Sequence, residues 1–253
     1  DKNISQEELA DAVGTTRQTV GGWTFNMTGG TIKGAGQASN SSVGLDFHNV
    51  ANNPGVINAK AATGATAEAP TVSTISTKVR YNGVLNVDVE ENARLDVTGA
   101  IVAGNKLTKS GAGTLRLANN DNDYSNKAFD VTGGTLELRD NAKTLNGAVT
   151  VSNGATLALL QTDGSANTLA NVTLNNGSLL TQSSGANYTT TLTSLAVGDG
   201  GATIGTQHDE VYGINSWQTT LAITALTGTG DLTVTSMSNT NNATTIRVDG
   251  GTG

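Results

Sequence analysis

The stretch LTKSGAGTLRL, residues 107–117, contains two short alternating strands joined by a turn of glycine and other small residues. The same form, strand, Gly or Asn turn, strand, recurs on both sides of it along the chain. Self-similarity of this kind predicts a repeat architecture. The clearest further copies are VDVEENARLDV (87–97), FDVTGGTLEL (129–138), VTVSNGATLAL (149–159) and VTLNNGSLLT (172–181).

The second strand of each copy carries a leucine at a nearly constant interval. Separations of 20, 21, 21 and 22 residues link Leu95, Leu115, Leu136, Leu157 and Leu179. A strand pair that buries one face is unstable alone, but coils stacked about 4.8 Å apart bury a continuous aliphatic column. The pattern predicts an all-β fold, a right-handed parallel β-solenoid of 20–22 residues per coil, with handedness taken from the rule for parallel crossovers. An antiparallel β-sandwich or barrel is the alternative.

Alternation within each strand predicts which side chains face the core. In TLEL, Leu136 and Leu138 point inward and Glu137 points outward, because successive strand residues face opposite sides. The equivalent outward positions of neighbouring copies are Asp96 and Arg116. We therefore expect leucines to stack inside the solenoid and an acid, base, acid ladder to run outside it.

The composition restricts both the core and the partners. Of 253 residues, 36% are hydrophobic and 4% aromatic, which indicates a narrow aliphatic core. The net charge of -7 disfavours nucleic acid as a partner, since phosphate backbones are bound by basic surfaces. There is no cysteine, and no apolar run approaches the roughly 18 residues of a membrane span.

Residues 107–142 also carry a family resemblance. The pattern L-x-K-x-G-x-G-T-L-x-L, an Asn-rich link ending near Tyr124 and then G-G-T-L resembles the passenger-associated repeat of bacterial autotransporters and related secreted β-helix proteins. This resemblance implies a bacterial protein that is secreted or held at the cell surface in association with the outer membrane. The family includes adhesins, peptidases, esterases and spacers, so the fold does not decide the function.

The N-terminal stretch SQEELADAVGTTRQTV, residues 5–20, resembles part of a repressor-type helix-turn-helix. In that family the recognition helix would begin at Thr15, Thr16, Arg17 and Gln18. The family's further helices are missing, because a β-repeat follows at once. We interpret residues 1–22 as a helical cap on a solenoid of residues 23–253, and keep DNA binding as a remote alternative.

Two similar turns suggest the most concrete enzymatic hypothesis. DVTGA (96–100) and DVTGG (130–134) resemble the Asp-Thr-Gly of aspartic peptidases, in which two carboxylates share a proton, but a valine is inserted after each aspartate. Asp96 and Asp130 are 34 residues apart, which is not a whole number of coils, whereas Asp88 and Asp130 are 42 apart. These three aspartates are the catalytic candidates of an aspartic-type peptidase. The structural alternative is that these aspartates face outward and take part in charge ladders or turns.

Broken periodicity gives a better binding-site candidate. From Ile204 to Leu232 the chain takes 28 residues, so we expect an insertion loop at 205–220. The ligand-binding candidates in this insertion loop are His208, Asp209, Glu210, Tyr212 and Trp217.

A second irregular region spans residues 35–77. No metal-binding spacing or cofactor motif occurs in the sequence, so we expect neither a metal nor a cofactor.

These observations favour a scaffold or an adhesin-like binding module over an enzyme. The polar, weakly charged surface and the aromatic and acidic residues of the insertion loop suit host glycans or glycoproteins, including mucin. Self-association of the coils is a further expectation. The aspartic-type peptidase, acting on glycoproteins such as mucin, is the enzymatic alternative.

Overall fold

The computed structural model contains β-strands and no helix within the residues that it describes. The chain forms two compact units, Asp1–Asp123 and Tyr124–Gly253. Across the described part of the chain, nothing has the helical length and hydropathy required to cross a membrane. The described residues are 24–33, 44–47, 54–102, 104–119, 124–139, 144–161, 166–183, 187–206, 219–236 and 244–250.

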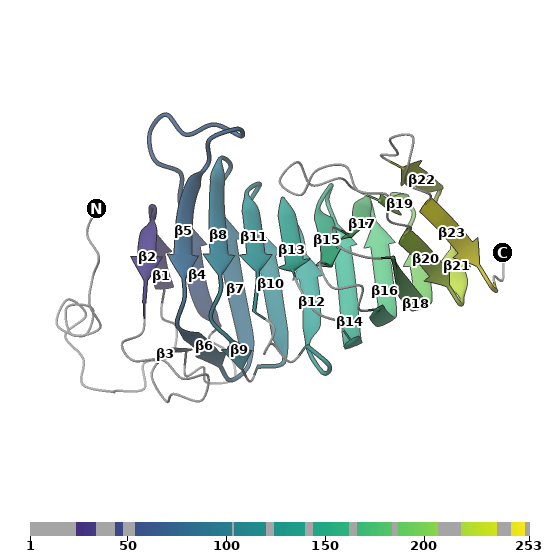
Figure 1. The fold of residues 1–253 in the computed structure, drawn as a ribbon, viewed down its shortest axis with the longest axis horizontal. Coiled ribbons are helices and arrows are strands. Elements are labelled where there is room, and N and C mark those ends of the chain that lie inside the picture. The colour runs from purple at the N-terminus through teal and green to yellow at the C-terminus, as the bar shows by residue number, and fades with distance from the viewer. Residues whose placement is uncertain are drawn as a thin grey trace. The chain divides into compact units, whose positions relative to one another are not determined.

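The first unit is a stack of coils in which the chain visits three sheets in turn (Figure 1). Strands one coil apart pair in parallel within each sheet. The first sheet contains β1 (Thr24–Met27), β4 (Gly55–Ala59), β7 (Val84–Val89) and β10 (Lys106–Ser110). The second contains β2 (Gly30–Ile32), β5 (Thr71–Ile75), β8 (Ala93–Val97) and β11 (Thr114–Leu117). The third contains β3 (Gly44–Phe47), β6 (Lys78–Tyr81) and β9 (Ile101–Val102).

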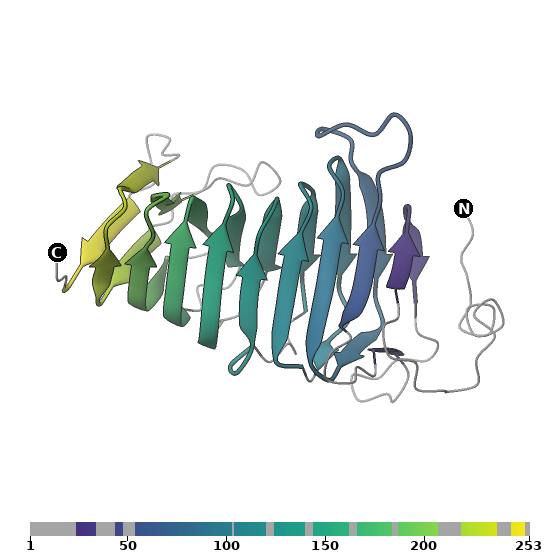
Figure 2. The same cartoon turned by 180° about the vertical axis from the view of Figure 1, so that it is seen from behind.

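The second unit repeats the design with two sheets, again with parallel pairing between successive coils (Figure 2). One sheet contains β12 (Ala128–Val131), β14 (Thr144–Ser152), β16 (Asn167–Asn175), β18 (Tyr188–Val197), β20 (Thr219–Ile223) and β23 (Thr244–Val248), with β21 (Leu226–Gly228) also beside β18. The other contains β13 (Thr135–Arg139), β15 (Thr156–Gln161), β17 (Gly177–Ser183), β19 (Ala202–Thr206) and β22 (Leu232–Ser236).

Each unit is therefore a parallel β-solenoid, which confirms the fold class predicted from the sequence repeat, and the arrangement is consistent with the right-handed form. The antiparallel β-sandwich or barrel is wrong for the described residues. Neighbouring strands of a sheet come from successive coils rather than from hairpins, and so they run in the same direction.

The predicted leucine stacking is also confirmed. In the first unit Leu95 pairs in register with Leu115, and in the second Leu136, Leu157 and Leu179 form one column. All five side chains are fully buried. Such a column removes aliphatic surface from water on every coil, which is the main stabilising contribution available to a chain with few aromatic residues.

Coil length follows the prediction in the middle of the chain and exceeds it toward the C-terminus. Leu95 and its partner Leu115 are 20 residues apart, and Leu157 and its partner Leu179 are 22 apart. Ile204 and its partner Val234, by contrast, are 30 residues apart. The extra length falls between β19 and β20, where residues 207–218 lie outside the described residues.

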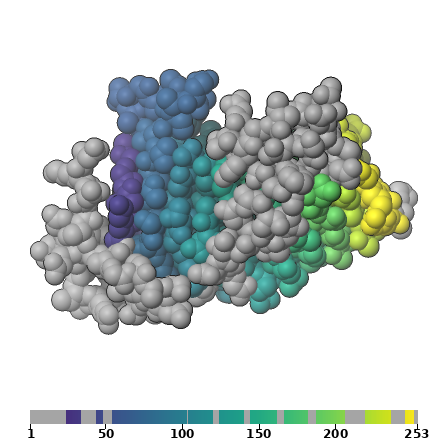
Figure 3. Space-filling view, viewed as in Figure 1, coloured from purple at the N-terminus to yellow at the C-terminus, as the bar shows by residue number. Residues whose placement is uncertain are grey.

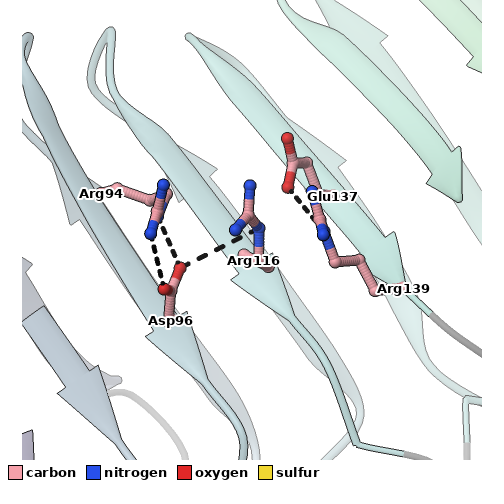
Figure 4. Close-up of polar contacts among 5 residues, drawn as sticks. All are labelled: Arg94, Asp96, Arg116, Glu137 and Arg139. Atoms are coloured by element: carbon pink, nitrogen blue, oxygen red, sulfur yellow. Dashed lines mark hydrogen bonds and ion pairs between the residues drawn. The ribbon is translucent and has the colours of Figure 1, made fainter. Parts of the chain in front are cut away.

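The predicted outer charge ladder is present in part, with an additional arginine. Arg116 lies 4.0 Å from Asp96 across the register between β11 and β8. Arg94, two residues before Asp96 on the same face, binds that carboxylate more closely, at 2.9 and 3.0 Å (Figure 4). Arg139 contacts Glu137 in the same way, at 3.2 Å. The ion pairs within one strand are thus shorter than the ion pair between two strands. They can form because residues i and i+2 of a strand lie on the same face of the sheet.

Lys109 is a charged residue at an inward position. The alternation that buries Leu107 also directs Lys109 into the core, in register with Val87. Its Nζ atom donates to the carbonyl oxygens of Ser110 and Gly111, at 2.6 and 2.8 Å. Burial lowers the pKa of Lys109 to about 8, while the Asp88 carboxylate acts in the opposite direction.

The connection between β4 and β5 projects beyond the sheets of the first unit (Figure 3). This loop, residues 60–70, is ordered by its own turns and by hydrogen bonds to neighbouring coils. Glu90 Oε2 accepts from the Ala61 amide at 2.8 Å, and Thr71 Oγ1 accepts from the Ala62 amide at 2.7 Å. It belongs to the region 35–77 that the sequence marks as irregular, and β3, β4 and β5 lie in that same region. The expected cap at residues 1–22 lies outside the described residues.

Candidate functional site

The catalytic candidates of the first unit stand on different sheets. Asp88 is exposed on β7, between the buried Val87 and Val89, and its Oδ1 accepts from Ser110 Oγ at 2.7 Å. Asp96 is on β8 and faces outward from the second sheet. The two carboxylates are therefore not brought together, and a proton-sharing dyad requires that they be adjacent.

Asp96 is engaged in ion pairs. Its carboxylate is only 15% exposed and receives both Arg94 and Arg116 (Figure 4). Two guanidinium groups occupy the oxygens of this carboxylate, which suits a structural ion pair more than an attack on a substrate.

Asp130, the third candidate, belongs to the second unit. It lies half-buried on β12 between the buried Phe129 and Val131, and it pairs in register with Thr150. Its outward direction follows from the same alternation as that of the other two aspartates.

The remaining predicted site residues lie outside the described residues. These are the insertion-loop candidates and the residues of the helix-turn-helix-like segment: His208, Asp209, Glu210, Tyr212, Trp217, Thr15, Thr16, Arg17 and Gln18. Within the described ranges, no group of three or more histidine or carboxylate side chains is placed to hold a metal ion.

A polar groove in the second unit is a site that sequence reasoning missed. Its cavity volume is about 280 Å³, and it lies where the chain turns from one sheet into the other on four successive coils. Its lining includes no lysine, arginine or aromatic residue. The lining residues are Gly154, Asn176, Gly177, Ser178, Asp199, Gly200, Gly201, Ala202, Thr203, Asp231 and Thr233.

A row of hydroxyl groups forms one wall of this groove. Ser178, Thr203 and Thr233 occupy equivalent positions on β17, β19 and β22 and pair in register. They face outward, because Leu179 and Ile204 beside them are fully buried. Adjacent members of such a row are about 4.8 Å apart. The same row continues outside the groove at Thr156 and Thr135.

Tight turns between the two sheets border the groove. Asn153 and Asn176 adopt positive φ angles of 58° and 54°, a conformation that asparagine tolerates better than most residues. Hydrogen bonds join the turns of successive coils, with the Gly154 amide donating to Asn176 O and the Asn176 amide to Gly201 O. Gly177 has no room for a side chain, since a Cβ atom would lie 2.4 Å from the Val151 carbonyl oxygen.

Two carboxylates complete the site. Asp199 and Asp231 are both exposed at the turns, and among the described residues neither forms an ion pair. Thr229 Oγ1 donates to Asp199 Oδ1, and Asn175 Oδ1 accepts from the Gly200 amide at 2.8 Å. The site therefore presents hydroxyls and carboxylates on a fixed backbone, which suits hydrogen bonding to a polar ligand that carries donor groups.

The sequence does contain a signal for this groove. The turns NNG (175–177), GDGG (198–201) and GTGD (228–231) recur at one edge of the solenoid; all contain glycine, and the last two also contain aspartate. The repeat alone identifies such turns only as connections between strands. Their stacking into a hollow depends on the register of the coils, which the turns alone do not reveal.

Comparison with known proteins supports the family resemblance. Residues 107–138, which include β11, β12 and most of β10 and β13, match the family model of the passenger-associated-transport-repeat. No curated protein and no solved structure matches the chain. A parallel β-solenoid that carries this repeat is similar to the passengers of autotransporters. The repeat thus implies a passenger-type surface protein and suggests a secreted or surface location.

Proposed function

We propose that this chain is a binding module of a bacterial surface protein and that its ligands are host glycans or glycoproteins such as mucin. The observation that carries the proposal is the groove of the second unit, where a hydroxyl row and two carboxylates line one polar hollow. Polar ligands are held by a few well-placed hydrogen-bonding groups on a rigid scaffold. Stacked coils provide such a scaffold, because each strand is fixed by both neighbours.

The proposal is tested by retention of the purified chain on immobilised mucin and on the same mucin stripped of its glycans. We expect retention on the glycosylated form and loss of retention on the stripped form. Equal retention on both would mean that the protein backbone is recognised, and no retention on either would remove mucin from the proposed ligands. The variant Ser178→Ala should weaken retention, while Thr156→Ala, in the same row but outside the groove, serves as the matched control.

A peptidase is less well supported by the arrangement of carboxylates. Asp88 and Asp96 lie on different sheets and face outward from them, and the Asp96 carboxylate forms ion pairs with two arginines. We therefore propose ligand binding as the function of the chain. The insertion loop at 205–220 is proposed as a second region that contacts the ligand.

A further inference from the structure

We propose that the groove of the second unit selects uncharged glycans over acidic ones and that the bound sugar chain lies across β17, β19 and β22. This inference rests on the proposed glycan-binding function and adds the ligand's charge and its direction. It is carried by the pair of carboxylates, by the absence of any basic residue from the groove lining, and by the register of the hydroxyl row.

The charge of the groove excludes acidic sugars. Asp199 and Asp231 are exposed on its rim, and its lining contains no lysine or arginine to receive a sugar carboxylate or sulfate. A uronic or sialic acid would approach two like charges with no compensating partner. Like-charge repulsion between exposed groups is strongest at low ionic strength and is screened over about 8 Å at 0.15 M salt.

The carboxylates are suited to sugar hydroxyls. A carboxylate oxygen accepts hydrogen bonds from a hydroxyl group, and bonds to an ionised acceptor are stronger than those between neutral groups. Thr229 already donates to Asp199 Oδ1, and this contact fixes the orientation of that carboxylate before a ligand arrives. Preorganisation of this kind reduces the entropy lost on binding.

The direction of the ligand follows from the repeat. Ser178, Thr203 and Thr233 present one hydroxyl on each of three successive coils, about 4.8 Å apart. This interval is comparable with the length of one sugar ring, so a sugar chain that crosses the strands meets one protein hydroxyl per residue. Gly200 and Gly201 carry no side chain, and their backbone remains accessible below the ligand.

Binding to a short oligosaccharide is expected to be weak. The groove lining contains no aromatic ring on which a sugar could stack, so the affinity depends on hydrogen bonds whose net contributions are small. We expect a Kd on the order of 1 mM for a tetrasaccharide. Multivalent presentation on a glycoprotein raises the apparent affinity without new contacts.

The test is calorimetric titration of the full chain with three tetrasaccharides of matched length: one neutral and N-acetylated, one deacetylated and cationic, and one made of uronic acids. We expect the neutral ligand to bind and the acidic ligand to bind at least about tenfold more weakly at low salt, which corresponds to about 1.4 kcal/mol. Ser178→Ala and Thr203→Ala should each weaken the neutral ligand severalfold, and Thr156→Ala should not.

The double variant Asp199→Asn, Asp231→Asn gives a readout that a merely structural role would not produce. It should remove the discrimination, so that the acidic ligand binds within about threefold of the neutral one. Unchanged discrimination in this variant, equal binding of acidic and neutral ligands by the native chain, or binding of the cationic ligand alone would overturn the inference. Failure of all three oligosaccharides and of mucin glycans would instead overturn the proposed function itself.

Discussion

Ser178 and Thr203 stand in register on adjacent strands of the second unit, and both face outward beside fully buried neighbours in the core. A single repeat thus produces two columns at once, an aliphatic column inside and a hydroxyl row outside. The inner column contributes stability and the outer row offers a ladder of identical polar groups. Substitutions can therefore separate folding from binding, because alternate residues of one strand serve different purposes.

The inner column should be sensitive to truncation. Leu157 is fully buried between Leu136 and Leu179, and Leu157→Ala would leave a cavity in a column that cannot close around it. We expect a loss of about 2–5 kcal/mol in the free energy of unfolding. Thr156→Ala, one residue earlier and outward, should change it by no more than about 0.5 kcal/mol. Urea unfolding monitored by circular dichroism measures both, and similar losses for the two variants would refute the assignment of faces.

Lys109 should give the stability of the first unit a specific pH dependence. Its pKa is lowered by burial from 10.5 to about 8 in the folded chain. Between these values the unfolded chain binds more protons than the folded chain, so stability should rise as pH increases through this window. The slope attributable to one group is at most about 1.4 kcal/mol per pH unit.

The variant Lys109→Met isolates this effect. Subtracting its unfolding free energy from that of the native chain between pH 8 and 9.5 should recover the slope. Lys60→Met, at an exposed position, should leave the slope intact. A flat difference curve for Lys109→Met would mean that the buried amine titrates at its ordinary pKa.

The ion pairs around Asp96 should stabilise the fold without serving catalysis. Asp96→Asn removes a largely buried carboxylate that forms ion pairs with two arginines, and we expect a loss of about 1 kcal/mol in the free energy of unfolding that shrinks at high salt. Asp46, whose contact with Arg80 is longer at 3.8 Å and more exposed, is the matched comparison. Its replacement by asparagine should have a smaller effect in the same unfolding experiment.

The peptidase alternative has its own test. Glycoprotein cleavage by the native chain should be undetectable from acid to neutral pH, because Asp88 and Asp96 do not form a proton-sharing pair. Cleavage that disappears in Asp88→Asn, Asp96→Asn or Asp130→Asn would establish a catalytic carboxylate and refute a purely binding function.

The groove turns should tolerate only residues that accept a left-handed backbone. Asn176 has a φ angle of 54°, so Asn176→Gly should be nearly neutral, whereas Asn176→Val should cost about 1–2 kcal/mol. Gly177→Ala should be destabilising for a different reason, since its Cβ atom would press on the Val151 carbonyl oxygen. Equal stability of the glycine and valine variants at position 176 would contradict the turn geometry.

Much of the fold could be predicted from the repeat itself. The interval between leucines defines the coil, and alternation assigns faces, so Leu136, Leu157 and Leu179 were correctly stacked. Arg94 as the nearest partner of Asp96 is not apparent from the repeat, because equivalent positions of different copies do not reveal contacts between residues two apart in one strand. The groove is not apparent from the repeat, because its lining comes from four successive coils and the depth of the hollow depends on backbone geometry that composition does not specify.

In our proposal the hydroxyl row and carboxylates of the second unit bind an uncharged glycan. Its most direct test is nuclear magnetic resonance of the labelled chain during titration with the neutral tetrasaccharide, following the backbone amides of Ser178, Thr203 and Thr233. We expect saturable chemical-shift changes at these three amides and at that of Asp199. The amide of Thr156, which continues the row outside the groove, should change little. Saturable shifts elsewhere, with the groove amides unmoved, would contradict it.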